Sequence, residues 1–244
     1  MMHCDFQIMK KVHQYVFVIL FLTVAVNILG QKTNVYGVFP TYNQWGKLNE
    51  KTNYELYYFT AAPIFGDVKY SGVSPRNWLL MYAEQSITYS PVKSWGLTGS
   101  YVYQVENGYD KANVDEHRLF LQTSYALHWN KVTMKHRLRH DSRFFSDAFK
   151  HRLRYQIALR GDWESGNYWT IGQEFFFELT NGSEKVYNEN WFNAGIGIKL
   201  NDQNYLELGA LNVTWATAKG TWLNQWYIQP TWVYRLDFSR KVNG

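Results

Sequence analysis

The stretch His151-Arg-Leu-Arg-Tyr-Gln-Ile-Ala-Leu-Arg160 decides the fold class of this chain. One set of alternate positions carries Leu153, Tyr155, Ile157 and Leu159, and the other set carries three arginines. Successive side chains of a β-strand point to opposite faces, so the stretch predicts a strand with one apolar face and one basic face.

The same alternation continues along the chain. It recurs over residues 132–139, 169–179 and 192–200, and no helical period of useful length follows Asn34. Segments of about 10 to 14 residues repeat about eleven times, and bacterial single-chain barrels use even numbers of strands, which favours ten or twelve. The sequence therefore predicts an all-β fold: a single antiparallel up-and-down transmembrane β-barrel of about 10 to 12 strands.

Connections between these segments alternate in length, as short periplasmic turns and longer external loops do in such barrels. The short connections are 48–53, 90–94, 129–131 and 200–204, and the longer ones are 64–76, 106–116, 146–150 and 181–190. Pro40 and Pro230 fall inside two predicted strands and weaken those two assignments, because proline cannot donate to the ladder.

Aromatic residues favour a barrel in lipid over a periplasmic β-sandwich, which would alternate in the same way. Tyr (19), Phe (15) and Trp (11) make up 18% of the chain, although its mean hydropathy is only -0.40. Tryptophans at or next to segment ends predict the aromatic girdles that membrane barrels carry at both interfaces. These are Trp95, Trp129, Trp191, Trp215 and Trp222.

The N-terminus predicts a cleavable signal peptide. Two lysines precede an almost wholly apolar run from Tyr15 to Leu29, after which the chain becomes polar. A run of about 15 residues is shorter than the roughly 20 that a spanning helix needs, which disfavours an uncleaved anchor. We expect residues 1–30 to be the signal peptide, with Met9 as an alternative start, and residues 31–244 to form the barrel.

The cysteine content and the distribution of charge exclude several other kinds of site and partner. Cys4 is the only cysteine and lies in the predicted signal peptide, so the mature chain forms neither disulfides nor zinc–thiolate sites. We expect no metal and no cofactor. The net charge of +5 would also fit nucleic-acid binding, but Lys and Arg alternate with apolar residues and do not cluster, so we expect no nucleic-acid partner.

Several short motifs carry a family resemblance. They are the end of the signal near Gln31, His-Arg-Leu-Arg at 136–139 and again at 151–154, Gln173-Glu-Phe-Phe176, Gly195-Ile-Gly-Ile-Lys199 and Tyr205-Leu-Glu-Leu-Gly209. With them the chain resembles the uncharacterised bacterial family called domain of unknown function 2490, over nearly all of the predicted mature chain. The resemblance implies an outer-membrane barrel and implies no activity, substrate or catalytic residue.

The arginines of the quoted stretch belong to a larger set of charges that we expect inside the barrel, because an Arg or Lys facing lipid at the bilayer midplane costs about 2 to 4 kcal/mol. The set is Lys135, Arg137, Arg139, Arg152, Arg154, Arg160, Glu174 and Glu178. We expect further charges to join it: Glu55, Glu84, Glu207, Arg235 and Asp237. Two interpretations stay open: a cross-strand ladder of ion pairs filling a narrow barrel, or a basic stripe that favours anions in a small pore.

An enzyme acting on lipid or lipopolysaccharide is the alternative, and it would need a Ser or Thr nucleophile beside a histidine base. The candidate histidines are His117, His128, His136, His140 and His151. His136 and His140 are four apart, which on a strand separates them by about 13 Å. Ser124 and His128 share a predicted face, but no known motif surrounds them.

We therefore predict a narrow channel or structural barrel in the bacterial outer membrane. Such a barrel contacts lipid and lipopolysaccharide and is inserted by the barrel-assembly machinery. The alternation leaves the oligomeric state open.

Overall fold

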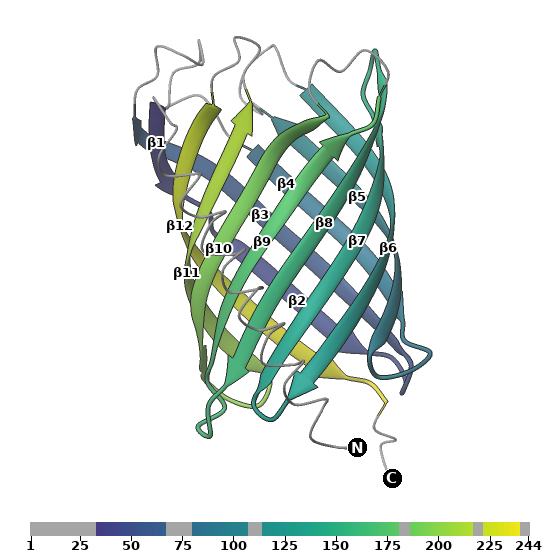
Figure 1. Ribbon diagram of the computed structural model, residues 1–244. Helices are drawn as coiled ribbons and strands as arrows, with labels where there is room; N and C mark the ends of the chain where they lie inside the picture. Colours follow the sequence, from purple (N-terminus) through teal and green to yellow (C-terminus); the bar gives the residue numbers. More distant parts are fainter. Residues whose placement is uncertain (1–32, 67–79, 107–113, 181–185, 217–221, 240–244) are drawn as a thin grey trace, which may run out of the picture.

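The computed structural model describes residues 33–66, 80–106, 114–180, 186–216 and 222–239, and in these ranges strands are joined by turns (Figure 1). The strands are β1 (Thr33–Val38), β2 (Thr41–Lys47), β3 (Thr52–Gly66), β4 (Leu80–Tyr89), β5 (Trp95–Glu106), β6 (Val114–Trp129), β7 (Val132–Phe144), β8 (Phe149–Asp162), β9 (Tyr168–Glu178), β10 (Tyr187–Lys199), β11 (Asn204–Ala216) and β12 (Trp222–Asp237). Within the same ranges, no helix has the length and apolar character needed to span a membrane. The predicted signal peptide lies outside the described residues.

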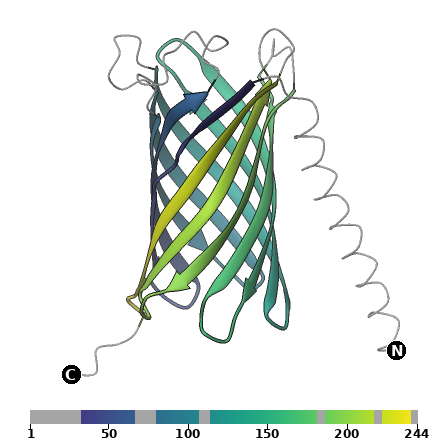
Figure 2. The same ribbon diagram turned by 90° about the vertical axis from the view of Figure 1, so that its left-hand side faces the viewer.

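The strands close into one barrel, tilted around a common axis (Figures 1 and 2). From β2 to β12 each strand pairs antiparallel with the next. Val38 pairs with Ile228 and Thr41 with Thr231, so the register against β12 is unchanged from β1 to β2. Consequently β1 and β2 are two halves of one strand position, and the barrel has 11 positions.

The expectation of an even strand number is therefore wrong, whereas the all-β barrel of about that size is confirmed. With an odd number of positions in an up-and-down barrel, the first and last strands run in the same direction. They can close the barrel only by parallel pairing, and both β1 and β2 pair parallel with β12. The pairing of β1 and β2 with β12 is called the seam below.

Connections gather at the two ends of the barrel. The short-turn end holds the turns 48–51, 90–94, 130–131, 163–167 and 200–203, and the opposite end is called the loop end. The expected longer connection at 146–150 is wrong: β7 and β8 are joined by a tight turn in which Phe145 N–H donates to the carbonyl of Ala148 at 2.9 Å. The other expected loops lie largely outside the described residues.

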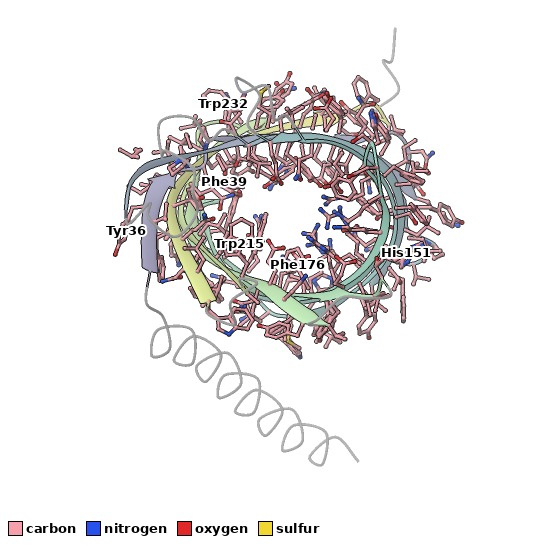
Figure 3. The ribbon with its side chains drawn as sticks, turned by 90° about the horizontal axis from the view of Figure 1, so that it is seen from above. Tyr36, Phe39, His151, Phe176, Trp215 and Trp232 are labelled. Atoms are coloured by element: carbon pink, nitrogen blue, oxygen red, sulfur yellow. The ribbon has the colours of Figure 1, made fainter. Side chains whose placement is uncertain are left out.

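The alternating pattern places apolar side chains outside and polar ones inside. Leu97, Leu119, Leu121, Leu208 and Ile228 are each more than half exposed on the outer face. Figure 3 shows Phe39, Phe176 and Trp215 pointing inward and Tyr36 and Trp232 pointing outward. The interior holds buried charges as well as these aromatic rings, which is the reverse of a soluble protein.

Candidate functional site

The candidate site is the lumen of the barrel. A cavity of about 680 Å³ lies inside it. Glu106 and Glu189 contribute to its lining near the loop end, and Asn53 and Lys93 contribute near the short-turn end. The cavity therefore extends along most of the barrel axis.

Asp141 on β7 is the centre of the buried charges, and its side chain is fully buried. Arg139 Nε donates to Asp141 Oδ1, and Asp141 Oδ2 lies 3.6 Å from Arg118 Nη1 and 3.7 Å from Arg154 Nη1. Arg139 also reaches Glu84 across the lumen at 3.2 Å. One carboxylate thus holds three guanidinium groups from three adjacent strands.

Glu116 on β6 forms a second centre nearer the loop end. Arg143 Nε and Nη2 each donate to one of its carboxylate oxygens at 2.7 Å, the two-pronged geometry that strengthens such pairs. Arg118 Nε donates to the same carboxylate at 2.8 Å. Arg118 therefore connects Glu116 to Asp141.

Two further groups extend the network over β8, β9 and β10. Glu174 Oε1 accepts hydrogen bonds from Arg137 Nη2 at 2.7 Å and from Arg154 Nε at 2.8 Å. Arg152 Nη1 donates to Glu189 Oε2 at 3.2 Å. The stripe that looked basic in the sequence is therefore largely neutralised by carboxylates.

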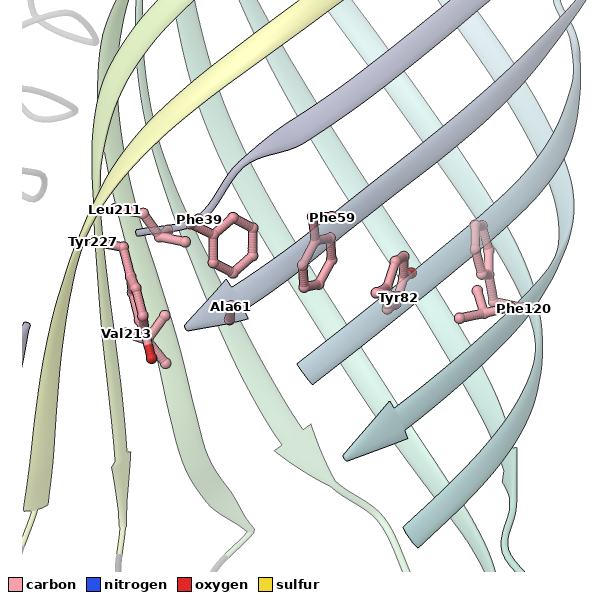
Figure 4. Close-up of a cluster of buried hydrophobic side chains, with 9 residues drawn as sticks. Phe39, Phe59, Ala61, Tyr82, Phe120, Leu211, Val213 and Tyr227 are labelled. Carbon is pink, nitrogen blue, oxygen red and sulfur yellow. The ribbon is translucent and has the colours of Figure 1, made fainter. Parts of the chain in front are cut away.

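An apolar surface, the aromatic wall, covers another part of the barrel interior and adjoins the charges at β6 (Figure 4). Phe39 stacks on Phe59 with ring centroids 4.3 Å apart, and Phe59 stacks on Tyr82 at 4.5 Å. Phe39 also meets Tyr227 edge-on at 5.6 Å and Trp191 at 6.2 Å. The whole cluster is Phe39, Phe59, Ala61, Tyr82, Val102, Phe120, Leu211, Val213 and Tyr227.

Cation–π contacts join the aromatic rings to the charges. The guanidinium of Arg139 lies 3.5 Å from the centroid of Phe120, and that of Arg154 lies 4.4 Å from the centroid of Phe176. Such contacts contribute most where the cation is desolvated, as both of these are. They hold the two guanidinium groups against aromatic rings inside the barrel.

Lys135, like Lys93 near the short-turn end, differs from the arginines of the lumen. Its side chain lines the cavity and is exposed to it, and within the described residues it forms no ion pair. Its neighbour Arg137 pairs with Glu174 but keeps a buried Nε without a hydrogen-bond partner. Small polar side chains such as Ser86, Thr98 and Ser124 line the cavity as well.

Comparison with known proteins identifies the family of this chain. Residues 67–235 match the family described as Protein of unknown function (DUF2490). The chain belongs to this family. The match runs from the segment before β4 into β12 and omits β1, β2 and β3, so it is narrower than the nearly complete mature chain expected from the motifs. Neither the curated proteins nor the solved structures contained a match.

In this DUF2490 member, most of the charges expected in the lumen line the cavity. They are Lys135, Arg137, Arg139, Arg152, Arg154 and Glu174, with Glu55 and Glu84. Glu178 is buried 3.8 Å from Arg143. Arg160 lies apart, near the short-turn end, where its guanidinium covers the ring of Tyr168 at 3.6 Å; Tyr168 in turn bonds to Glu207.

Sequence reasoning missed several members of the network. They are Glu106, Glu116, Arg118, Asp141, Arg143 and Glu189. A usable signal existed for two of them, because Asp141 and Arg143 continue the alternation of Lys135, Arg137 and Arg139 along β7. The omission made the lumen look more basic than it is.

The tryptophans expected in the girdles divide between two faces. Trp191 and Trp215 line the lumen cavity, so their assignment to the outer surface is wrong. Each sits near the end of a strand, but its position in the alternation points it inward. Trp129 and Trp222 occupy outward positions of β6 and β12. Trp95 packs on the outward Tyr125 at 5.1 Å and also contributes to the lining of the cavity.

Three of the candidate histidines in this family member lie within hydrogen-bonding distance of a Tyr or Thr hydroxyl group. Tyr101 Oη lies 2.6 Å from His117 Nδ1, Tyr155 Oη lies 2.8 Å from His136 Nδ1, and Thr133 Oγ1 lies 3.0 Å from His128 Nδ1. His140 and His151 stack on each other at 5.2 Å. In the described ranges, no serine hydroxyl is bonded to a histidine, and no group of three or more His, Cys, Asp or Glu side chains is arranged to hold a metal.

Proposed function

We propose that this protein is an outer-membrane β-barrel that acts as a narrow channel for small polar solutes. The main support for a channel is a cavity that is lined by residues from both ends of the barrel. The apolar outer surface supports the membrane location, because soluble monomers rarely expose apolar surface on every side. Residues 1–30 would direct export, and lipid and lipopolysaccharide would surround the barrel.

The paired charges serve as the channel wall. Buried arginines without partners would be strongly unfavourable, and their cross-strand carboxylates offset that penalty while bracing adjacent strands. This arrangement supports the ion-pair ladder over a continuous basic stripe. Ion preference then depends on the few charges that remain unpaired.

Lys135 is the residue that we expect to set this preference. It faces the cavity without an ion pair in the part of the chain that the structure describes, although the charge of Glu55 in the same lining acts on it at longer range. Fixed cations lining a pore favour anions. The channel should therefore pass small anions somewhat better than cations.

Conductance in a planar bilayer tests the proposal. The refolded chain should give small, discrete steps with a modest preference for chloride over potassium, and Lys135→Glu should reverse that preference. Lys131→Glu is the matched control, since Lys131 pairs with Glu164 at the short-turn end and does not line the cavity. Its permeability ratio should stay close to that of the unmodified chain.

Two results would overturn the proposal. A preparation shown to be folded by heat-modifiable gel mobility that gives no steps would mean a closed barrel. Equal shifts in permeability ratio for the Lys135 and Lys131 variants would remove Lys135 as the selectivity residue.

A further inference from the structure

The seam contains two prolines at the same height. The register that pairs Val38 with Ile228 and Thr41 with Thr231 places Pro40 opposite Pro230. Both prolines lie within strand positions of the barrel, one at the break between β1 and β2 and one inside β12. Proline has no N–H, so each removes a hydrogen bond from a ladder.

Pro230 removes a bond across the seam itself. Phe39 N–H donates to the carbonyl of Ile228 at 2.9 Å. In a parallel ladder the N–H two residues further along, at position 230, would return a bond to the carbonyl of Phe39. The Thr41 hydroxyl donates to that carbonyl instead, at 3.2 Å, so the carbonyl is satisfied within its own strand and does not link the seam.

Pro40 removes a bond on the other side of the same strand. Thr60 N–H donates to the carbonyl of Pro40 at 3.1 Å, but Pro40 has no N–H to donate back to Thr60. At one height, the strand formed by β1 and β2 therefore lacks one ladder bond to β12 and one to β3.

Apolar side chains flank this point on both faces. Outside, Ile228 is 61% exposed and Pro40 is also exposed. Inside, Phe39, Tyr227 and Phe59 belong to the aromatic wall, directly behind the seam (Figure 4). The path from bilayer to lumen is thus largely apolar, and the polar side chains beside it, Gln229 and Thr41, are hydrogen-bonded to each other across the seam at 3.4 Å.

The cavity that the aromatic wall lines offers an amphiphile both apolar and cationic contacts. Its lining includes Phe39, Phe59 and Tyr227, and also Lys135 and Arg137. Lys135 forms no ion pair, and Arg137 Nε is buried without a hydrogen-bond partner, in the described part of the chain. An acyl chain on the wall with an anionic head at these cations would satisfy both.

We propose that the seam at Pro40 and Pro230 is a lateral portal, through which a single-chain amphiphile with a carboxylate head passes between the bilayer and the lumen cavity. The strand of β1 and β2 separates locally from β12, and Phe39 moves with it. This inference rests on the membrane location in the proposed function, and it does not require that the barrel conduct ions.

A reversible lock across the seam tests the portal. Val38→Cys with Ile228→Cys joins directly paired residues on neighbouring strands, whose spacing suits a disulfide, in a chain carrying Cys4→Ser. The protein is refolded into phosphatidylcholine vesicles containing diazirine-labelled palmitate and irradiated. Labelled residues are then mapped individually in the reduced and oxidised forms.

Reduced protein should carry label on inward residues such as Phe39 and Tyr227, and oxidation should lower that label several-fold. Leu121→Cys with His140→Cys is the control, because it locks an ordinary antiparallel ladder between β6 and β7 and should change nothing. Lys135→Gln should weaken labelling by palmitate and leave labelling by the uncharged alcohol of equal length unchanged.

Label confined to outward residues such as Ile228 and Leu208, or interior label that survives the seam disulfide, would overturn the portal. Conductance recorded on the same preparations separates the two proposals. Conductance steps without interior labelling would support the channel and contradict the portal. Interior labelling that depends on the seam, without conductance steps, would support the portal and contradict the channel.

Discussion

At the scale of single residues, the lumen depends on a few side chains that serve several partners at once. Asp141 is the clearest case, because Arg139, Arg118 and Arg154 all approach one fully buried carboxylate. The contribution of Asp141 to stability therefore depends on all three of these contacts together. Its removal leaves several buried cations facing one another.

We expect Asp141→Asn to lower the free energy of unfolding by about 3 to 5 kcal/mol, the usual effect of breaking a buried ion pair from one side. Urea titration of the refolded protein, followed by tryptophan fluorescence, measures it. Asp162→Asn is the control, since its pair with Arg160 is half-exposed and should contribute about 0 to 1 kcal/mol. Similar losses for the two variants would contradict the central role of Asp141.

Glycines under aromatic rings are a second feature at this scale. Gly46, Gly161 and Gly197 each lie beneath the ring of the residue paired with them on the next strand, where a Cβ atom would collide with that ring. For Gly197 the ring belongs to Tyr168, which also bonds to Glu207.

Gly197→Ala should therefore displace Tyr168 and lower the free energy of unfolding by about 1 to 3 kcal/mol, as overpacking does. Gly99→Ala is the matched strand control, because a Cβ at Gly99 meets nothing within 4 Å. That variant should be neutral or gain a few tenths of a kcal/mol from the reduced entropy of the unfolded chain. Thermal unfolding of the two variants side by side decides the point.

At the scale of elements, the strand formed by β1 and β2 is the distinctive part of the barrel. It enters between β12 and β3 with parallel pairing on one side and antiparallel pairing on the other. Pro40 at its centre and Pro230 opposite on β12 each remove a ladder hydrogen bond at that height. A missing hydrogen bond can be restored without altering any side-chain contact of the lumen charges.

Pro230→Ala restores the N–H that faces the carbonyl of Phe39 and should raise the free energy of unfolding by about 0.5 to 1.5 kcal/mol. Pro91→Ala, in the turn between β4 and β5, supplies no ladder bond and should not stabilise the barrel. Slower hydrogen exchange at positions 39 to 41 in the Pro230 variant would locate the effect. A lower free energy of unfolding for Pro230→Ala would contradict the prediction that an N–H at position 230 bonds across the seam.

At the scale of the whole molecule, the distribution of polarity is inside out. Leucines and isoleucines cover the outer face of β5, β6, β11 and β12, while buried charges fill the interior. In water this arrangement would expose a broad apolar belt. In lipid it satisfies both faces of every strand.

Leu121 is 72% exposed near the middle of β6 and tests this distribution. Leu121→Arg should cost about 2 to 4 kcal/mol in vesicles, because the charge would face hydrocarbon. Leu48→Arg, in a turn at the short-turn end, should cost little. Equal and small effects, measured by folding into vesicles, would argue that the outer face of the barrel does not contact lipid.

The sequence by itself determined the strands and their faces. The alternation at 151–160 lies inside β8, and the inward positions it predicts for Arg152 and Arg154 are the ones that line the cavity. Short turns at 130–131 and 200–203 could also be located, because polar residues interrupt the alternation there. Local periodicity suffices for these features, since each depends only on neighbours along the chain.

Only the tertiary structure decided how the barrel closes and which charges meet. Arg139 and Glu84 are 55 residues apart, and Phe39 meets Trp191 across two intervening strands. Trp191 looks like a girdle residue in the sequence and is a lumen residue in the barrel. Strand number, register and the parallel seam bring such residues together, and these depend on closure of the whole sheet and not on any local pattern.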